Sequence, residues 1–309
     1  MTRFFDSRSG MITLLLILGV GWGATQPLGK LATSTGYPPF GLIFWQLVIC
    51  TVVLGSLSLV RGRGLVFTRA SLRFYVVVAL LGTLVPNATF YISVARLPAG
   101  IMSILISTVP LLAFPMALML GIDRFSVPRL LGLCLGLCGV LLIALPKASL
   151  PDPAMAAFLP FALIGPLFYA MEGTYVARFG TAGMDALQAM FGASLVGLVM
   201  CLPVVLALDQ WFVPALPFGP AEWGLLLSSA LHGLLYATYV WLAARAGAVF
   251  AAQASYIVTA SGLFWSMILL GERFSSWVWL ALVVMLAGLA MVQPRPKVPA
   301  IRPTQAETR

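Results

Sequence analysis

Charged residues are scarce in this chain. Asp, Glu, Lys and Arg make up only 9% of its 309 residues, whereas a soluble domain carries about 25%. Hydrophobic residues make up 61%, and the mean hydropathy is +1.02. Because so few polar side chains cannot cover a water-facing surface, we expect lipid to be the solvent of this protein.

Other absences exclude classes of function. The four cysteines lie in apolar runs without CxxC or Cys/His spacing, which favours packing over a disulfide or a metal site. No GxxxxGK[ST] sequence occurs, which argues against nucleotide hydrolysis by a P-loop. There is one histidine, and no cluster of His, Asp and Glu such as an intramembrane enzyme needs. We therefore predict no cofactor, no metal and no enzymatic activity.

Apolar runs of about twenty residues make up most of the sequence. They show no period-2 alternation, which favours membrane-spanning helices over barrel strands. We predict an all-α polytopic membrane protein with ten transmembrane helices. The predicted spans are 11–33, 39–60, 74–94, 98–120, 127–145, 154–177, 184–208, 221–244, 248–270 and 276–292.

The distribution of basic residues predicts how the chain is oriented in the membrane. The net charge is +9, but Lys and Arg lie mainly in short loops, as membrane topology requires, so we predict no nucleic-acid partner. With a cytoplasmic N-terminus, fourteen of the eighteen fall on the cytoplasmic side, three on the other side and Lys30 inside the first helix. This bias predicts a multi-pass protein of the bacterial inner (plasma) membrane with both termini cytoplasmic. The alternative of a cleaved signal peptide is weakened by a long first run without a small-x-small site.

The two halves of the sequence resemble each other. At an offset of 149 residues, Ala95-Arg96 falls on Ala244-Arg245, Asp123-Arg124-Phe125-Ser126 on Glu272-Arg273-Phe274-Ser275, and Gly139 on Gly288. Five helices per copy is an odd number, which predicts two inverted repeats related by an axis in the membrane plane. We place helices 1–5 in residues 1–148, helices 6–10 in 149–292, and a disordered cytoplasmic tail in 293–309.

These features resemble the EamA family of the drug/metabolite transporter superfamily. The resemblance covers about residues 11–292 and rests on Gly21-Trp22-Gly23, Lys30, Pro38-Pro39 and the Gly-Glu-Arg-Phe turn before the last helix. It implies transport of amino acids, nucleobases or other metabolites, often as export. Members of the family often carry an Arg early in the second helix, where this chain has Trp45-Gln46, so an anion contact there is in doubt.

Two titratable residues are candidates for proton coupling. Glu172 is the only acid well inside a predicted span, where a charge costs about 2.5–3.5 kcal/mol. His232 is the sole histidine, and its ordinary pKa near 6.5 suits proton exchange. The alternatives are that Glu172 reaches headgroup water and that His232 is a neutral packing group.

Polar and aromatic side chains inside the spans are candidates for substrate binding. The predicted set is Trp22, Gln26, Asn87, Tyr91, Ser107, Tyr169, Tyr236, Gln253 and Tyr256. Lys30 either extends to the interface or contacts a substrate carboxylate. Prolines in the first, third, fourth and sixth spans predict kinks beside a central cavity.

Together these features predict a secondary transporter. It would export an amino acid or related small metabolite by alternating access, with proton coupling as an option. A membrane sensor or scaffold without transport is the main alternative; an intramembrane enzyme or a channel fits less well. Substrate identity and oligomeric state, monomer or homodimer, stay open.

Overall fold

A computed structural model describes residues 7–121, 123–145, 149–246 and 253–292 of the chain. Side chains are not described for Arg8, Val240 and 243–246. Lys147, Ala248, the side chain of Arg245 and the predicted tail 293–309 therefore lie outside the described residues.

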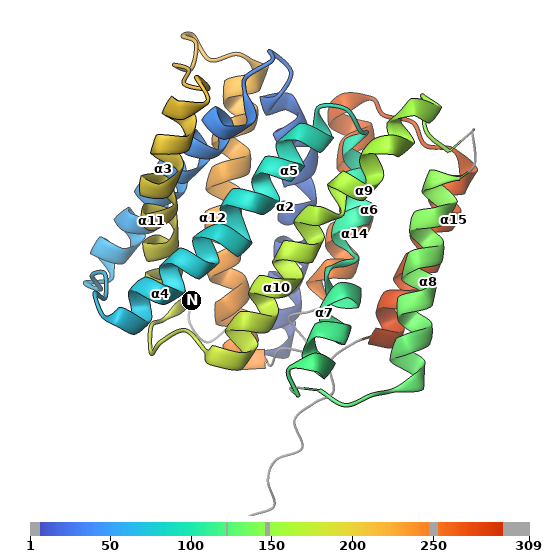
Figure 1. Ribbon diagram of the computed structural model, residues 1–309, viewed down its shortest axis with the longest axis horizontal. Helices are drawn as coiled ribbons and strands as arrows, with labels where there is room; N and C mark the ends of the chain where they lie inside the picture. Colours follow the sequence, from blue (N-terminus) through green and yellow to red (C-terminus); the bar gives the residue numbers. More distant parts are fainter. Residues whose placement is uncertain (1–6, 122, 146–148, 247–252, 293–309) are drawn as a thin grey trace, which may run out of the picture.

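The described residues fold into a bundle of helices (Figure 1). The helices are α2 (Arg8–Ala32), α3 (Pro39–Val60), α4 (Arg69–Ala79), η1 (Leu80–Leu84), α5 (Val85–Val94), α6 (Ala99–Ile106), α7 (Val109–Met119), α8 (Val127–Ala144), η2 (Pro153–Phe158), α9 (Leu159–Ala162), α10 (Ile164–Phe179), α11 (Ala186–Ala207), α12 (Pro220–Ala246), α14 (Ala254–Leu270) and α15 (Ser276–Val292).

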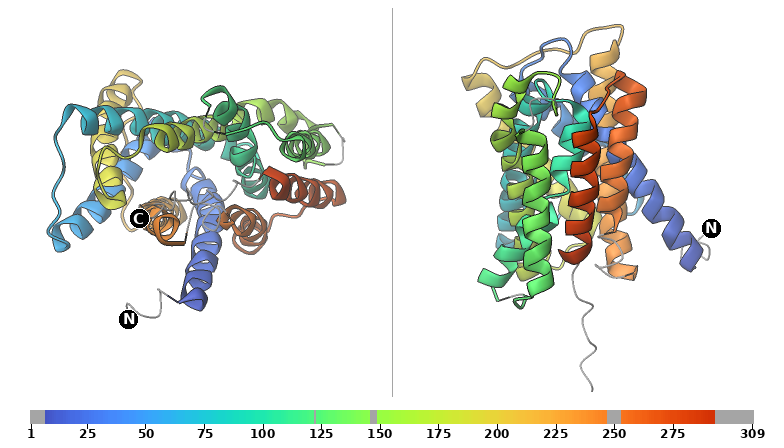
Figure 2. Two further views of the ribbon diagram at one scale, coloured as in Figure 1. Left: turned by 90° about the horizontal axis from the view of Figure 1, so that it is seen from below. Right: turned by 90° about the vertical axis from the view of Figure 1, so that its right-hand side faces the viewer.

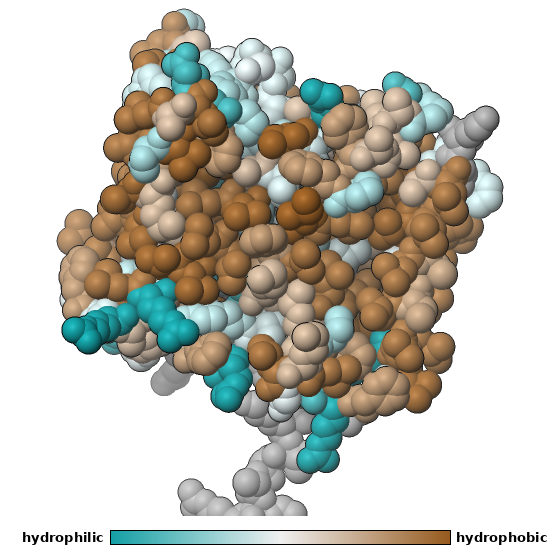
Figure 3. Space-filling view, in the orientation of Figure 1, coloured by the Kyte–Doolittle hydropathy of each residue, from teal (hydrophilic) through white to brown (hydrophobic). Residues whose placement is uncertain are grey.

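Several of these helices match a bilayer in length and composition. Within the described residues, seven helical segments are long and apolar enough to span a membrane, some of them formed by consecutive helices such as α4, η1 and α5. The shorter apolar helices are α14 and α15. Brown hydrophobic side chains form a broad band across the molecule, with hydrophilic ones gathered mainly toward its edges (Figure 3). The chain is a multi-pass membrane protein, as its composition predicts; the count of ten spans stays a prediction.

The bundle has two faces with loops. We call the face that carries residues 33–38, 95–98, 208–219 and 271–275 the distal face, and the opposite one, where the described chain begins and ends, the terminal face (Figures 1 and 2). On the distal face the hydroxyl of Tyr37 donates a hydrogen bond to Glu222, which raises the pKa of Tyr37. On the terminal face Arg63 forms an ion pair with Asp185 at 3.3 Å.

Helices from the two halves of the chain pack against each other. α8 packs along α15, α3 along α11, and α2 against both α12 and α14; α10 packs against α5 and α7. Toward its N-terminal end α2 leans away from the rest of the bundle (Figure 2), where Ile12, Leu16 and Ile17 are exposed.

Glycines make the closest of these contacts. A Cβ on Gly132 would lie 2.5 Å from the carbonyl oxygen of Gly288 in α15, and one on Gly23 would lie 2.1 Å from the Ser261 hydroxyl of α14. Because only hydrogen fits at such distances, these glycines permit close helix approach within one chain.

The prolines act unequally on their helices. α2 continues as one helix through Pro27. In contrast, Pro86 follows a π-helical turn, η1, in which the Val85 amide bonds the Leu80 carbonyl. Since Pro86 cannot donate to the carbonyl four residues earlier, that of Gly82, the ordinary helical pattern is interrupted there. The fourth predicted span likewise divides into α6 and α7 just before Pro110.

Candidate functional site

The bundle encloses a central cavity of about 350 Å³. Pockets that bind small molecules measure about 300–1,000 Å³, so this volume suits a small solute. Residues of α2, α3, α5, α6, α7, α9, α10, α12 and α14 line it, so both halves of the chain contribute.

The structure brings together most of the predicted site residues. The predicted residues that line the cavity are Trp22, Gln26, Asn87, Tyr91, Ser107, Tyr169, Glu172, His232 and Tyr236. Gln253 and Tyr256 lie outside this lining, because α14 begins at Ala254 and turns Ser255 and Val258 toward the cavity instead. Gln253 precedes the helix and is exposed.

Glu172 lies on α10, and its carboxyl is close to residues of α12 and η1. Its side chain is buried, with the residue 6% exposed, and its carboxyl lies near the Tyr236 hydroxyl of α12. The carboxyl also lies directly over Gly82, where a Cβ would come within 2.5 Å of the Glu172 Cδ. Gly82 of the π-helical turn η1 therefore contacts the one acid among the described residues that line the cavity.

Aromatic rings from α2 and α12 form one wall of the cavity. The ring centroid of Trp22 lies 5.5 Å from that of Tyr239 and 6.3 Å from that of Tyr236. His232 continues this wall, with its ring 6.4 Å from Tyr236. Because Ser228, His232, Tyr236 and Tyr239 follow helical spacing, they share one face of α12.

Amides of α3 and α5 form another part of the lining. The Tyr91 hydroxyl donates to Oε1 of Gln46 at 2.9 Å, so Gln46 positions a neighbouring ring. Asn87 is buried, 6% exposed, and its Nδ2 has no hydrogen-bond partner among the described residues. An unsatisfied buried amide costs about 1–3 kcal/mol, which indicates that a ligand or water completes this site.

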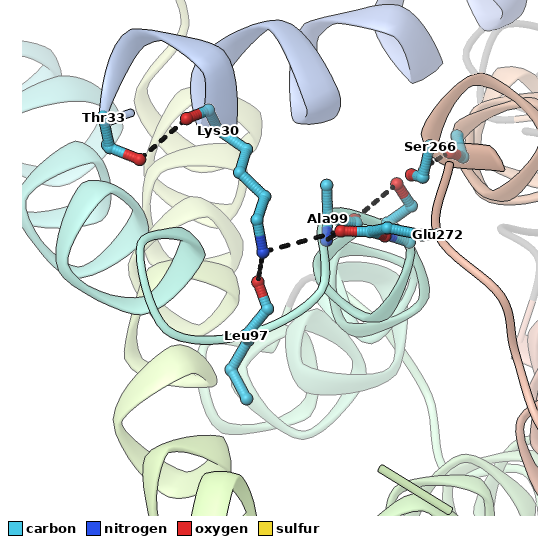
Figure 4. Close-up of polar contacts among 9 residues, drawn as sticks. Lys30, Thr33, Leu97, Ala99, Ser266 and Glu272 are labelled. Carbon is cyan, nitrogen blue, oxygen red and sulfur yellow. Dashed lines mark hydrogen bonds and ion pairs between the residues drawn. The ribbon is translucent and has the colours of Figure 1, made fainter. Parts of the chain in front are cut away.

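Lys30 and Glu272 form a polar cluster beside the cavity at the distal face (Figure 4). The Lys30 ammonium donates to the Leu97 carbonyl at 2.6 Å and lies 3.5 Å from Oε1 of Glu272. The Glu272 carboxylate also accepts the first two backbone N–H groups of α6, from Ala99 at 2.8 Å and Gly100 at 3.0 Å. We call Lys30, Glu272 and these α6 partners the distal cluster.

The distal cluster answers the question that the sequence left open for Lys30. The Lys30 ammonium has a partner that neither reading predicted: Glu272, an acid from the other half of the chain, forms an ion pair with it. Within the described residues that line the cavity, none is Lys or Arg.

Some contributors were not among the predicted site residues. Gln46 was noted only as a departure from the family pattern, and Tyr239 follows His232 and Tyr236 on the same face of α12. Gly82 carries no sequence signal, because its role depends on a carboxyl ninety residues later in the chain.

The bundle and its cavity define a class: a multi-pass helical membrane protein with a cavity lined by residues of both halves. The EamA-like transporter family matches residues 9–145 and 157–293. The chain therefore belongs to the EamA-like transporter family and holds two EamA repeats, as the sequence resemblance predicts.

Two further comparisons complete this assignment. A solved structure, titled only as the crystal structure of a protein, has a TM-score of 0.62 and 17% identity, covering 90% of this chain and 97% of the other. At this identity the likeness shows a shared fold alone. No curated protein matches the chain.

Proposed function

We propose that this protein is a secondary transporter that moves an amino acid or related small metabolite across the membrane, with export the favoured direction. The observation that carries the proposal is a cavity built from both halves and lined by polar, aromatic and acidic groups from widely separated helices. It binds the solute in the middle of the bundle and opens alternately to either side.

Inverted repeats are part of the proposal. At the offset of 149 residues α2 is equivalent to α10, and α8 to α15. α8 packs on its own equivalent, and α2 packs on α12 and α14 as α10 packs on their equivalents α5 and α7. This exchange of partners is what a two-fold axis between halves 1–148 and 149–292 produces, and supports ten spans in all. Both chain ends would then be cytoplasmic in an inner membrane.

The proposed conformation is closed at the distal face. Glu272 of the second half joins Lys30 and the start of α6 from the first half there. Its equivalent on the terminal face, Asp123, pairs with Arg129 of its own half. This asymmetry supports a state that is closed at the distal face. The N-terminal end of α2, which leans away from the bundle, lies toward the terminal face (Figure 2).

The experiment that tests transport uses purified full-length protein in proteoliposomes. Labelled amino acids, nucleobases and amines are screened for flux with and without a pH gradient. We expect at least one solute to move faster than in empty liposomes, and the gradient to stimulate this flux if Glu172 exchanges protons. Glu172→Gln should then abolish the stimulation, while Asp209→Asn, an exposed acid in the 208–219 loop, should keep it.

Two outcomes contradict the proposal at different levels. If no solute moves, the sensor or scaffold alternative replaces transport. If a solute moves but neither the gradient nor Glu172→Gln alters its flux, proton coupling through Glu172 is wrong and transport stands.

Gly82→Ala should impair transport without unfolding the protein. The new Cβ would meet the Glu172 carboxyl at about 2.5 Å, and the flexible side chain must swing away. Misplacing a functional group by about 1 Å can cost up to about 100-fold, so we expect flux to fall about tenfold or more. Gly64→Ala is the control, because its Cβ meets nothing within 4 Å. Full flux in Gly82→Ala would show that the position of the Glu172 carboxyl does not affect the transport rate.

A further inference from the structure

The charge of the cavity lining bears on which solute it accepts. Glu172 is the one acid among the described lining residues, and Lys and Arg are missing from that set. The nearest ammonium, that of Lys30, is held by Glu272 and by the Leu97 carbonyl in the distal cluster. A solute carboxylate would therefore find no cationic partner in this lining, whereas a solute cation would find a carboxylate.

The aromatic wall adds to the preference of the cavity for a cationic solute. The rings of Trp22, Tyr236 and Tyr239 lie together, and the Tyr236 hydroxyl lies near the Glu172 carboxyl. Ring faces attract ammonium groups by about 0.5–2 kcal/mol, most strongly where water is excluded. Rings and carboxylate at one place thus compensate a cation for part of its lost hydration.

The part of the lining around Asn87 is suited to an uncharged end of the solute. Asn87 presents an amide Nδ2 that is buried and unpartnered among the described residues. Phe90, Met102 and Leu105 add apolar surface beside it. Such a lining accepts an apolar or aromatic body that carries a single hydrogen-bond acceptor.

We propose that the cavity selects small amphipathic organic cations, with the ammonium between Glu172 and the Trp22–Tyr236–Tyr239 rings and the apolar body toward Asn87. This inference rests on the proposed transport site and adds its charge selectivity. It narrows the cargo to amines, quaternary ammonium compounds, and amino acid derivatives whose carboxylate is masked.

Equilibrium binding to the full-length protein in nanodiscs tests this selectivity. Three probes share one phenyl body and differ in charge: phenyltrimethylammonium, phenylalanine and 3-phenylpropionate. At pH 8 we expect the cation to bind at least tenfold more tightly than the anion. Equal or tighter binding of 3-phenylpropionate, or no binding of the cation at millimolar concentration, overturns the inference.

Matched variants assign the effect to the named side chains. Glu172→Gln should weaken cation binding tenfold or more, and Asp209→Asn, which removes an exposed acid, should not change it. Trp22→Leu should weaken it severalfold, whereas Trp223→Leu alters a tryptophan that is 50% exposed and should have no effect. Thermal melting of each variant identifies any that fail to fold, and the Glu172 and Trp22 variants act as independent tests. Unchanged binding in both overturns the inference.

Flux measurements separate this inference from the proposed function. If phenylalanine or 3-phenylpropionate is transported at least as well as the cation, transport stands and cation selectivity is wrong. If the cation binds as expected but no solute of the full panel moves, the site selects cations and the transporter proposal is wrong.

Discussion

Glu272→Gln is expected to open the distal face of the protein. The carboxylate of Glu272 holds three groups of the first half: the Lys30 ammonium and the amides of Ala99 and Gly100. An amide side chain keeps one acceptor oxygen and loses the charge. Removing one partner of a buried pair costs about 3–5 kcal/mol. The Lys30 side chain is 29% exposed, so solvent screening lowers this to about 1–3 kcal/mol.

Such a loss would shift the population of conformations strongly. Since 1.4 kcal/mol corresponds to tenfold in an equilibrium constant, opening toward the distal side should increase about five- to a hundredfold. The measurement is labelling of Thr25→Cys, in the cavity lining, by a membrane-impermeant thiol reagent added on the distal side. The four native cysteines are first replaced by alanine.

Controls separate the distal cluster from its surroundings. Arg273→Gln removes a charge from the same turn, but its side chain is exposed and the labelling rate should stay unchanged. Lys30→Met should accelerate labelling like Glu272→Gln, and the double variant should add less than the sum of both, as for residues in one network. Equal labelling rates in all variants would show that the distal cluster does not hold this face closed.

The helical membrane fold was predictable because its causes lie in the local sequence. Apolar runs such as 39–60 coincide with α3 in the structure, since length and composition largely decide that a segment enters lipid. The polar residues of the site were predictable for a related reason. A residue such as Glu172 or Asn87 is costly in an apolar span, so its presence predicts a polar cavity.

What the sequence did not predict depends on tertiary contacts. The π-helical turn at Gly82 follows from Pro86, but its match to the Glu172 carboxyl depends on how α10 packs. Lys30 likewise had two local explanations, and a distant acid provided a third. Gln253 and Tyr256 were predicted as site residues, but Gln253 precedes α14, and the helix turns Ser255 and Val258 toward the cavity instead.

Gly288→Leu is expected to disrupt the contact between α8 and α15. A Cβ on Gly288 would lie 2.6 Å from the carbonyl oxygen of Gly132 and 3.0 Å from the amide nitrogen of Gly136. These are backbone atoms, which cannot move aside as a side chain end can. Overpacking costs about 1–3 kcal/mol and sometimes more, and here the helices must separate. We expect a melting temperature lower by several degrees or loss of monodisperse protein in detergent.

Val283→Leu is the matched control for this variant. It also enlarges a side chain of α15, but Val283 is 63% exposed and would face lipid, so the melting temperature should stay unchanged. Gly288→Ala should lie between the two, because its single methyl still meets the Gly132 carbonyl. The α8–α15 pair joins the two repeats and contributes no side chain to the lining of the central cavity among the described residues. If Gly288→Ala folds, it should therefore lower stability while the affinity for phenyltrimethylammonium is retained. Melting curves of Gly288→Leu that match the unaltered protein would show that this glycine contact does not hold the repeats together.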